Sequence, residues 1–194
     1  MHETFAAIEA DIVDRLRAGA SDRKSAMHAP VVATADARAR VMVLRAVTRG
    51  ADSGRLTLRF HTDARSPKVG VVTRDPRIGV LFYDADAKVQ IRVRGRGRIE
   101  RDGPVADAAW EESTNFARRC YLAEAGPGTP ADAPTSGLPD WAEGIQPSDS
   151  QIAPARQHFA VMLVDLYELD WFYLDNDGHR RARYADGTWT WVVP

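Results

Sequence analysis

Apolar and polar residues alternate over much of this chain with the two-residue period of β-strands. Between residues 55 and 62, Leu56, Leu58 and Phe60 share one face, and polar side chains occupy the other. The same pattern, bounded by turn residues, predicts further strands. We expect them at residues 30–35, 40–47, 77–84, 88–101, 159–171, 179–184 and 188–193. The run from Arg40 to Val47 is nearly all apolar, so we expect that strand to be buried over most of its length.

Helical patterns are fewer. Phe5, Ile8, Ile12 and Leu16 are spaced as one face of a helix, which we expect to end at Gly19. Pro104 opens a second helix predicted over residues 104–122. Ser66 is a plausible N-cap and Pro67 the first residue of a short helix, because proline lacks only an N–H that is unpaired there anyway.

The region 125–150 is rich in Pro, Gly, Ala, Ser and Asp, and we expect a long surface loop with one helical turn near Trp141. Neither a repeat nor a linker divides the rest of the chain. Seven or eight strands with a few helices predict a mainly β (α+β) fold, a small antiparallel barrel with peripheral helices, in a single domain spanning residues 1–194.

Composition narrows the function classes. The formal net charge of −1 gives no global signal for nucleic acid or acidic lipid. Cys120 is the one cysteine and the five histidines are scattered, so we predict no metal site. Acidic residues interrupt the N-terminal apolar positions, and no apolar run has transmembrane length, so we expect a cytoplasmic protein without a membrane span.

Two stretches carry candidate binding chemistry. Residues 60–68 read as a strand end, a polar loop and a helix N-terminus, where N–H groups with Thr62, Ser66 and Lys68 make a phosphate cradle. The alternative is an ordinary strand-to-helix turn. Alternate positions from Arg92 to Arg98 are arginines, which indicates either a salt-bridged face, the reading we favour, or a polyanion groove. Two strand glycines in the same stretch, Gly95 and Gly97, indicate a bend, a bulge or a close approach.

Several segments, in this order, resemble the pyridoxamine 5′-phosphate oxidase family of FMN-binding split barrels. They are RVMVLR at 40–45, FHTDARSPK at 60–68, DPRIGVLF at 75–82, VQIRVRG at 89–95, LDWF at 169–172 and the C-terminal RRARY and WTWVVP. The resemblance covers residues 40–103 and 159–194 well, and it hardly covers 125–150. It implies a split β-barrel that binds FMN between the two subunits of a homodimer.

The resemblance also implies a set of cofactor ligands. Arg40 and Lys68 match the phosphate ligands, Arg45 a lysine near the phosphate, and Gln90 a glutamine on the isoalloxazine from the partner subunit. Trp171 or Phe172 matches a late aromatic beside the flavin, for which core packing is the alternative. The cofactor-binding residues predicted in this way are Arg40, Val41, Leu44, Arg45, His61, Thr62, Ser66, Lys68, Gln90, Trp171 and Arg183.

This sequence departs from the family pattern at three places. Pro67 replaces a phosphate arginine, for which Arg65 is a candidate substitute. Arg118 or Arg119 is the candidate for the arginine that holds a substrate phosphate, but the tyrosine that accompanies it is missing, and so is a late histidine. The resemblance therefore implies an FMN-dependent oxidoreductase of open substrate, with no catalytic residue assigned. The alternative is a non-enzymatic flavin-, cofactor- or polyanion-binding module on the same barrel.

Overall fold

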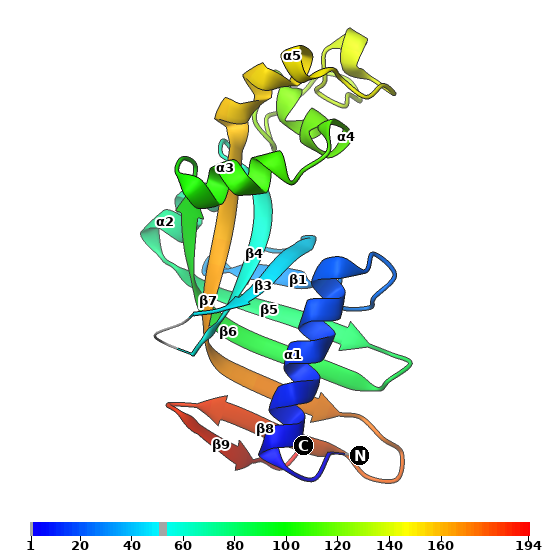
Figure 1. The fold of residues 1–194 in the computed structure, drawn as a ribbon, viewed down its shortest axis with the longest axis vertical. Helices are drawn as coiled ribbons and strands as arrows, with labels where there is room; N and C mark the ends of the chain where they lie inside the picture. Colours follow the sequence, from blue (N-terminus) through cyan, green and yellow to red (C-terminus); the bar gives the residue numbers. More distant parts are fainter. Residues whose placement is uncertain (1, 51–53) are drawn as a thin grey trace.

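In the computed structural model, which describes residues 2–50 and 54–194, the strands form one antiparallel sheet of nine strands (Figure 1). The strands are β1 (Val31–Thr34), β2 (Ala39–Val41), β3 (Leu44–Arg49), β4 (Leu56–Asp63), β5 (Arg77–Asp84), β6 (Val89–Glu100), β7 (Phe159–Tyr173), β8 (Arg180–Ala185) and β9 (Thr188–Trp191). The helices are α1 (Phe5–Ser21), α2 (Pro67–Arg74), α3 (Pro104–Glu111), α4 (Asn115–Arg118) and α5 (Asp149–Ile152), with 3₁₀ turns η1 (Arg119–Leu122), η2 (Asp140–Ala142) and η3 (Ala153–His158). The predicted mainly β chain with several helices is confirmed.

The main path of the sheet runs β2-β1-β5-β6-β7-β4-β3, and β8 pairs with both β7 and β9. The two end strands of this path, β2 and β3, are separated by only Met42 and Val43 in the chain. Three residue steps join Val41 to Leu44, and an extended chain spans at most about 11 Å over three steps. The two edges therefore come close together, so the sheet is strongly curved.

β7 is the strand on which the others are assembled. Its first half lies between β6 and β4, and its second half lies between β6 and β8. Opposite β7, the register shifts between Arg94 and Gly95, which leaves Tyr167 as an extra residue. After this bulge the odd-numbered residues of β7, rather than the even-numbered ones, face the core, so Leu166 and Leu169 both point into it.

Gly95, beside the bulge, shows why the alternating arginine strand contains glycine. A methyl group at this position would lie 2.6 Å from Val164 Cγ1 and 2.8 Å from the carbonyl oxygen of Asp165. Such distances are far inside van der Waals contact. The predicted close approach and the predicted bulge are both present here.

The main core lies between α1 and the concave side of the sheet (Figure 1). The predicted apolar stripe of α1 is confirmed, since Ile8, Ile12 and Leu16 are fully buried. The predicted end of the helix is wrong: α1 continues to Ser21. Gly19 serves packing instead, because a Cβ there would meet the Met27 side chain and backbone at 2.7 Å.

A second, smaller core lies on the other side of β7, under α3, η1 and η3. Phe159 is its centre and contacts Trp110 and Tyr121 edge-on, at 5.4 and 5.2 Å between ring centroids. The single helix predicted over 104–122 is wrong. Helix α3 ends at Glu111, and a new helix, α4, begins at Asn115. The hydroxyl of Thr114 caps α4 by accepting from the N–H of Ala117.

The strand predicted over residues 40–47 is also corrected. It is two short strands, β2 and β3, and most of their residues are not buried because they form the two edges of the sheet. The predicted strands at 30–35, 77–84 and 88–101 are confirmed. The predicted loop at 125–150 is confirmed, with η2 at Trp141. The Gly, Ala, Asp and Ser residues at positions 50–54 also predict a hairpin turn. Residues 51–53 lie outside the described part of the chain, while the antiparallel pairing of β3 with β4 is present.

Within residues 2–50 and 54–194, none of the helices combines the length and the apolar character needed to span a bilayer.

Candidate functional site

A cavity of about 370 Å³ opens beside the N-terminus of α2. Its walls come from β2 and the residues just after it, the start of β3, the end of β4, the start of α2 and the segment 117–127. The predicted cofactor ligands that line it are Arg40, Val41, Arg45, His61, Thr62 and Lys68. The cavity therefore brings together predicted cofactor ligands that are up to 28 positions apart in the sequence.

Lys68 lies at the centre of the polar contacts on this wall. Its Nζ donates to Thr62 Oγ1 at 3.0 Å and to Ser66 Oγ at 2.7 Å. Ser66 is the N-cap residue of α2 by position, yet its side chain makes no capping bond and accepts from Lys68 instead. Burial and the nearby Arg40 charge lower the pKa of Lys68. An anion between the two cations would remove that repulsion.

Arg40 reaches the cavity from β2, with its guanidinium anchored on β1. Its Nη1 donates to Thr34 Oγ1 at 2.9 Å, and Thr34 in turn donates to Asp36 at 2.6 Å. Arg45, which is exposed, enters from β3. These guanidiniums and the ammonium of Lys68 place three cations on one cavity, next to the start of α2, where the helix dipole favours an anion.

His61 supplies a neutral polar group to the same cavity. Burial, followed by the charges of Arg45 and Arg59, lowers the pKa of His61 to about 3, so the imidazole is uncharged at neutral pH. Its ring meets Phe159 edge-on at 5.0 Å between centroids. Within the described residues its Nε2 is buried without a hydrogen-bond partner. A buried polar atom without a partner is costly.

The other predicted ligands lie elsewhere. Leu44 is fully buried in the main core. Trp171 is also a core residue, and its Nε1 donates to Asp11 Oδ2 at 3.0 Å, because the bulge in β7 turns it inward. Arg183 lines a separate groove of about 500 Å³ over β1, β5, β6, β7 and β8. Gln90 is half-buried on β6, opposite Phe172.

Neither candidate for a substrate-phosphate arginine points into the cavity. Arg118 donates Nε and Nη2 to the carbonyl oxygen of Trp110, at 2.8 and 2.5 Å, and its guanidinium lies over the Trp110 ring. Arg119 donates to the carbonyl oxygens of Ala142 and Ile145, at 3.4 and 3.0 Å. Both side chains hold backbone in place, at the end of α3 and in the long loop.

The arginine stripe of β6 is a salt-bridged face, as favoured from the sequence. Arg92 pairs with Asp170 at 2.6 Å, Arg94 pairs with Glu168 at 3.3 Å, and Arg98 contacts Asp165. Burial alone would raise the pKa of Asp170, but hydrogen bonds from Arg181 and Arg92 outweigh it and lower the pKa. Acids on β7 therefore pair with three of the four arginines of the stripe, which argues against a polyanion groove.

The sequence did not indicate the far wall of the cavity. Ala117, Cys120, Tyr121 and Pro127 line it, more than 48 residues after Lys68. Their residue types carry no binding signal by themselves, and only the tertiary fold brings them to the site. Across the described parts of the chain, no group of three His, Cys, Asp or Glu side chains is placed to hold a metal ion.

Comparison with known proteins agrees with this geometry. Residues 13–101 match the family model of the pyridoxamine 5′-phosphate oxidase, FMN-binding domain. The predicted resemblance to this family is confirmed. The matched stretch contains Arg40, Arg45, His61, Thr62 and Lys68, which all line the cavity.

Two crystal structures share the fold of this chain. One is a pyridoxamine 5′-phosphate oxidase-related, FMN binding protein from Nostoc punctiforme PCC 73102, with 22% identity, a TM-score of 0.67 and coverage of 98% of this chain and 100% of that one. The other is PhzG from Burkholderia lata 383 in complex with tetrahydrophenazine-1-carboxylic acid, with 19% identity, a TM-score of 0.64 and coverage of 97% and 89%. At these identities the likeness establishes the fold.

Proposed function

We propose that this protein binds FMN, with the flavin phosphate in the cavity beside α2, and acts as an FMN-dependent oxidoreductase. The observation that carries the proposal is the cation cluster of Arg40, Arg45 and Lys68 at a helix N-terminus, beside the hydroxyls of Thr62 and Ser66. Arginine and lysine are the side chains best suited to a phosphate dianion. Asp63 also lines the cavity, but Arg65 engages its carboxylate.

The lining fits the rest of the cofactor as well. His61 lines the cavity as a neutral imidazole, and Val41, Met42 and Tyr121 supply apolar surface in the same cavity. FMN, when bound, supplies the redox chemistry of such a site. The residues of this chain would grip the phosphate, keep His61 neutral beside the ligand and shield the cavity through the segment 117–127.

We propose further that the curved sheet is a split barrel and that two copies complete each flavin site. Gln90, the predicted contact from the partner subunit, and Arg183, another predicted cofactor ligand, do not line the cavity that holds Arg40 and Lys68. A second copy would bring those contacts to the flavin. The proposal does not extend to pyridoxamine 5′-phosphate as substrate, because Arg118 and Arg119 are both bonded to backbone carbonyls.

The test begins with the visible absorbance spectrum of the purified protein and the mass of any released cofactor. We expect bound FMN, which a nicotinamide cofactor reduces and an acceptor reoxidises with turnover. Bound FMN without turnover would instead support a non-enzymatic flavin-binding module. A protein that neither contains nor takes up FMN would refute the proposal.

Two double variants test the assignment of Arg40 and Lys68 as phosphate ligands. Arg40→Ala combined with Lys68→Ala should abolish FMN retention in a protein that still folds and keeps its oligomeric state. Lys24→Ala combined with Arg38→Ala removes the same charge at two exposed positions outside the cavity and should retain FMN. Stoichiometric flavin in the first double variant would contradict the assignment.

A further inference from the structure

An ion pair joins Asp63, which lines the candidate phosphate cavity, to Arg65, which does not. Arg65 donates Nη2 to Asp63 Oδ2 at 2.7 Å and Nε to Asp63 Oδ1 at 3.1 Å. The backbone N–H of Arg65 also donates to Asp63 Oδ1, at 2.7 Å. The carboxylate side chain is 7% exposed and the arginine side chain 23%. This two-point contact fixes the guanidinium plane in one orientation.

The remaining guanidinium nitrogen of Arg65, Nη1, bonds to a part of the chain that is distant in sequence. Arg65 Nη1 donates to the carbonyl oxygen of Ala123 at 2.9 Å and to that of Glu124 at 3.3 Å. Gly126 packs against the same side chain, since a Cβ at that position would lie 3.0 Å from Arg65 Cβ. One arginine therefore supports the chain from residue 123 to residue 126.

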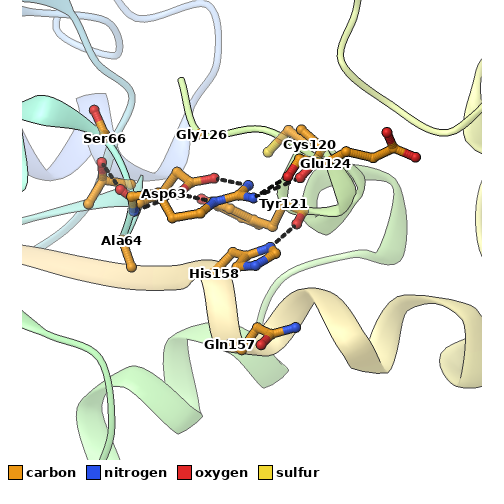
Figure 2. A network of polar contacts seen from close by, with 12 residues as sticks. Asp63, Ala64, Ser66, Cys120, Tyr121, Glu124, Gly126, Gln157 and His158 are labelled. Atoms are coloured by element: carbon orange, nitrogen blue, oxygen red, sulfur yellow. Dashed lines mark hydrogen bonds and ion pairs between the residues drawn. The ribbon is translucent and has the colours of Figure 1, made fainter. Parts of the chain in front are cut away.

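The supported segment is the far wall of the cavity. Cys120, Tyr121 and Pro127, on either side of the Arg65 contacts, all line it. His158 makes a second attachment, with its Nδ1 at 2.9 Å from the carbonyl oxygen of Tyr121 (Figure 2). The loop that contains Asp63 and Arg65 also carries Thr62, Ser66 and Lys68, so one short stretch provides both the anion-binding groups and the support of the opposite wall.

Arg65 does not act as a substitute phosphate ligand. It is absent from the residues that line the cavity, and the donors described above face Asp63 and the wall. We propose that Arg65 is a positioning residue, which fixes the wall formed by residues 117–127 over the bound cofactor and thereby slows its release. The nature of the ligand rests on the proposed function, whereas the support of the wall does not.

The experiment compares Arg65→Gln with Arg65→Lys and a control. Glutamine cannot bridge the carboxylate and the two carbonyl oxygens, and lysine can satisfy only one side at a time. Arg101→Gln is the control, because Arg101 donates to the carbonyl oxygen of Ala64 in the same loop at 3.1 Å but is not bonded to the wall in the described structure. Arg65→Gln leaves the buried carboxylate of Asp63 without its partner. If this single variant does not fold, the double variant Asp63→Asn with Arg65→Gln takes its place in the experiment.

Two readouts are needed. Hydrogen–deuterium exchange of residues 117–127 should accelerate in the protein without flavin for Arg65→Gln, less so for Arg65→Lys, and not for Arg101→Gln. The dissociation rate of FMN should rise about tenfold to a hundredfold for Arg65→Gln, the usual effect of losing charge-assisted hydrogen bonds. An intermediate rate for Arg65→Lys would support positioning by the guanidinium fork.

The outcomes separate the two proposals. Faster FMN release with unchanged exchange of residues 117–127 would overturn the positioning role, because Arg65 would then act on the cofactor directly. Unchanged exchange and unchanged release would also overturn it. If the wild-type protein binds no FMN, the proposed function fails, while the exchange experiment still decides whether Arg65 holds the wall.

Discussion

The substitution Lys68→Met isolates the contribution of one cation to phosphate binding. Methionine keeps the unbranched shape and most of the length of the side chain, and it removes the charge and the donors. In the protein without ligand, the change loses bonds to Thr62 and Ser66, each worth about 1 kcal/mol. It also relieves burial of the ammonium and its repulsion by Arg40, the two causes that lower the pKa of Lys68. We therefore expect the free energy of unfolding to change by less than about 1 kcal/mol.

The effect on FMN should be much larger than the effect on stability. A contact between an ammonium and a phosphate dianion is worth about 1.5–3 kcal/mol, so the dissociation constant for FMN should rise about 10- to 150-fold. Riboflavin, which lacks the phosphate, should bind wild type and Lys68→Met within about twofold of each other, a difference of about 0.4 kcal/mol. Both constants come from quenching of flavin fluorescence at fixed ionic strength.

The comparison between FMN and riboflavin decides whether Lys68 binds the phosphate. If Lys68→Met weakens riboflavin as much as FMN, the lysine does not bind the phosphate, and the variant has instead deformed the cavity. Thermal unfolding without ligand distinguishes the two explanations, since a deformed cavity should lower the melting temperature. FMN affinity unchanged by the substitution would refute the phosphate site outright.

Further predictions concern the sheet and the far wall. Gly95→Ala should lower the free energy of unfolding in urea by about 1–3 kcal/mol through overpacking, whereas Gly79→Ala, whose methyl meets no atom within 4 Å, should change it by less than about 0.5 kcal/mol. The pKa of Asp170 is lower in the folded state than in the unfolded state. The stabilisation from its ionised carboxylate is therefore complete above the unfolded pKa of about 4, and it is lost as the pH falls through the folded pKa. The destabilisation caused by Asp170→Asn, measured by urea unfolding, should therefore shrink below about pH 4, and a constant difference would contradict this. FMN should lower the rate of thiol labelling of Cys120 in proportion to the fraction of protein left without ligand, by about 100-fold at 100 times the dissociation constant, and equal rates with and without FMN would place the ligand elsewhere.

Local patterns in the sequence predicted most of the sheet. The strands β4, β5 and β6 were found because their side chains alternate and their ends carry Asp, Gly or Pro. In the half of the site that is contiguous in sequence, Thr62, Ser66 and Lys68 were found from the strand end and the helix N-terminus, whereas His61 was assigned by the family resemblance. Residues 40–47 were misread because the sequence shows apolar content but not the Met42–Val43 break between two sheet edges.

Features that depend on distant segments were not predictable in this way. The bulge at Tyr167 follows from the partner strand β6, and it decides that Trp171 enters the core. The wall at 117–127 meets Lys68 only through tertiary contacts. Arg65 was considered as a phosphate ligand, and only the positions of the carbonyl oxygens of Ala123 and Glu124 show its different role.

The central position of β7 has a consequence during synthesis on the ribosome. β4 is complete at residue 63, yet its partner on β7 ends at residue 165 in their shared ladder. At about 5–20 residues per second, β4 waits roughly 5–20 s for that partner, and β6 waits for most of its pairing as well. For that time one side of each strand is an open edge, available to other nascent chains. Rare codons placed before residue 159 would lengthen the exposure and should lower the yield of folded protein.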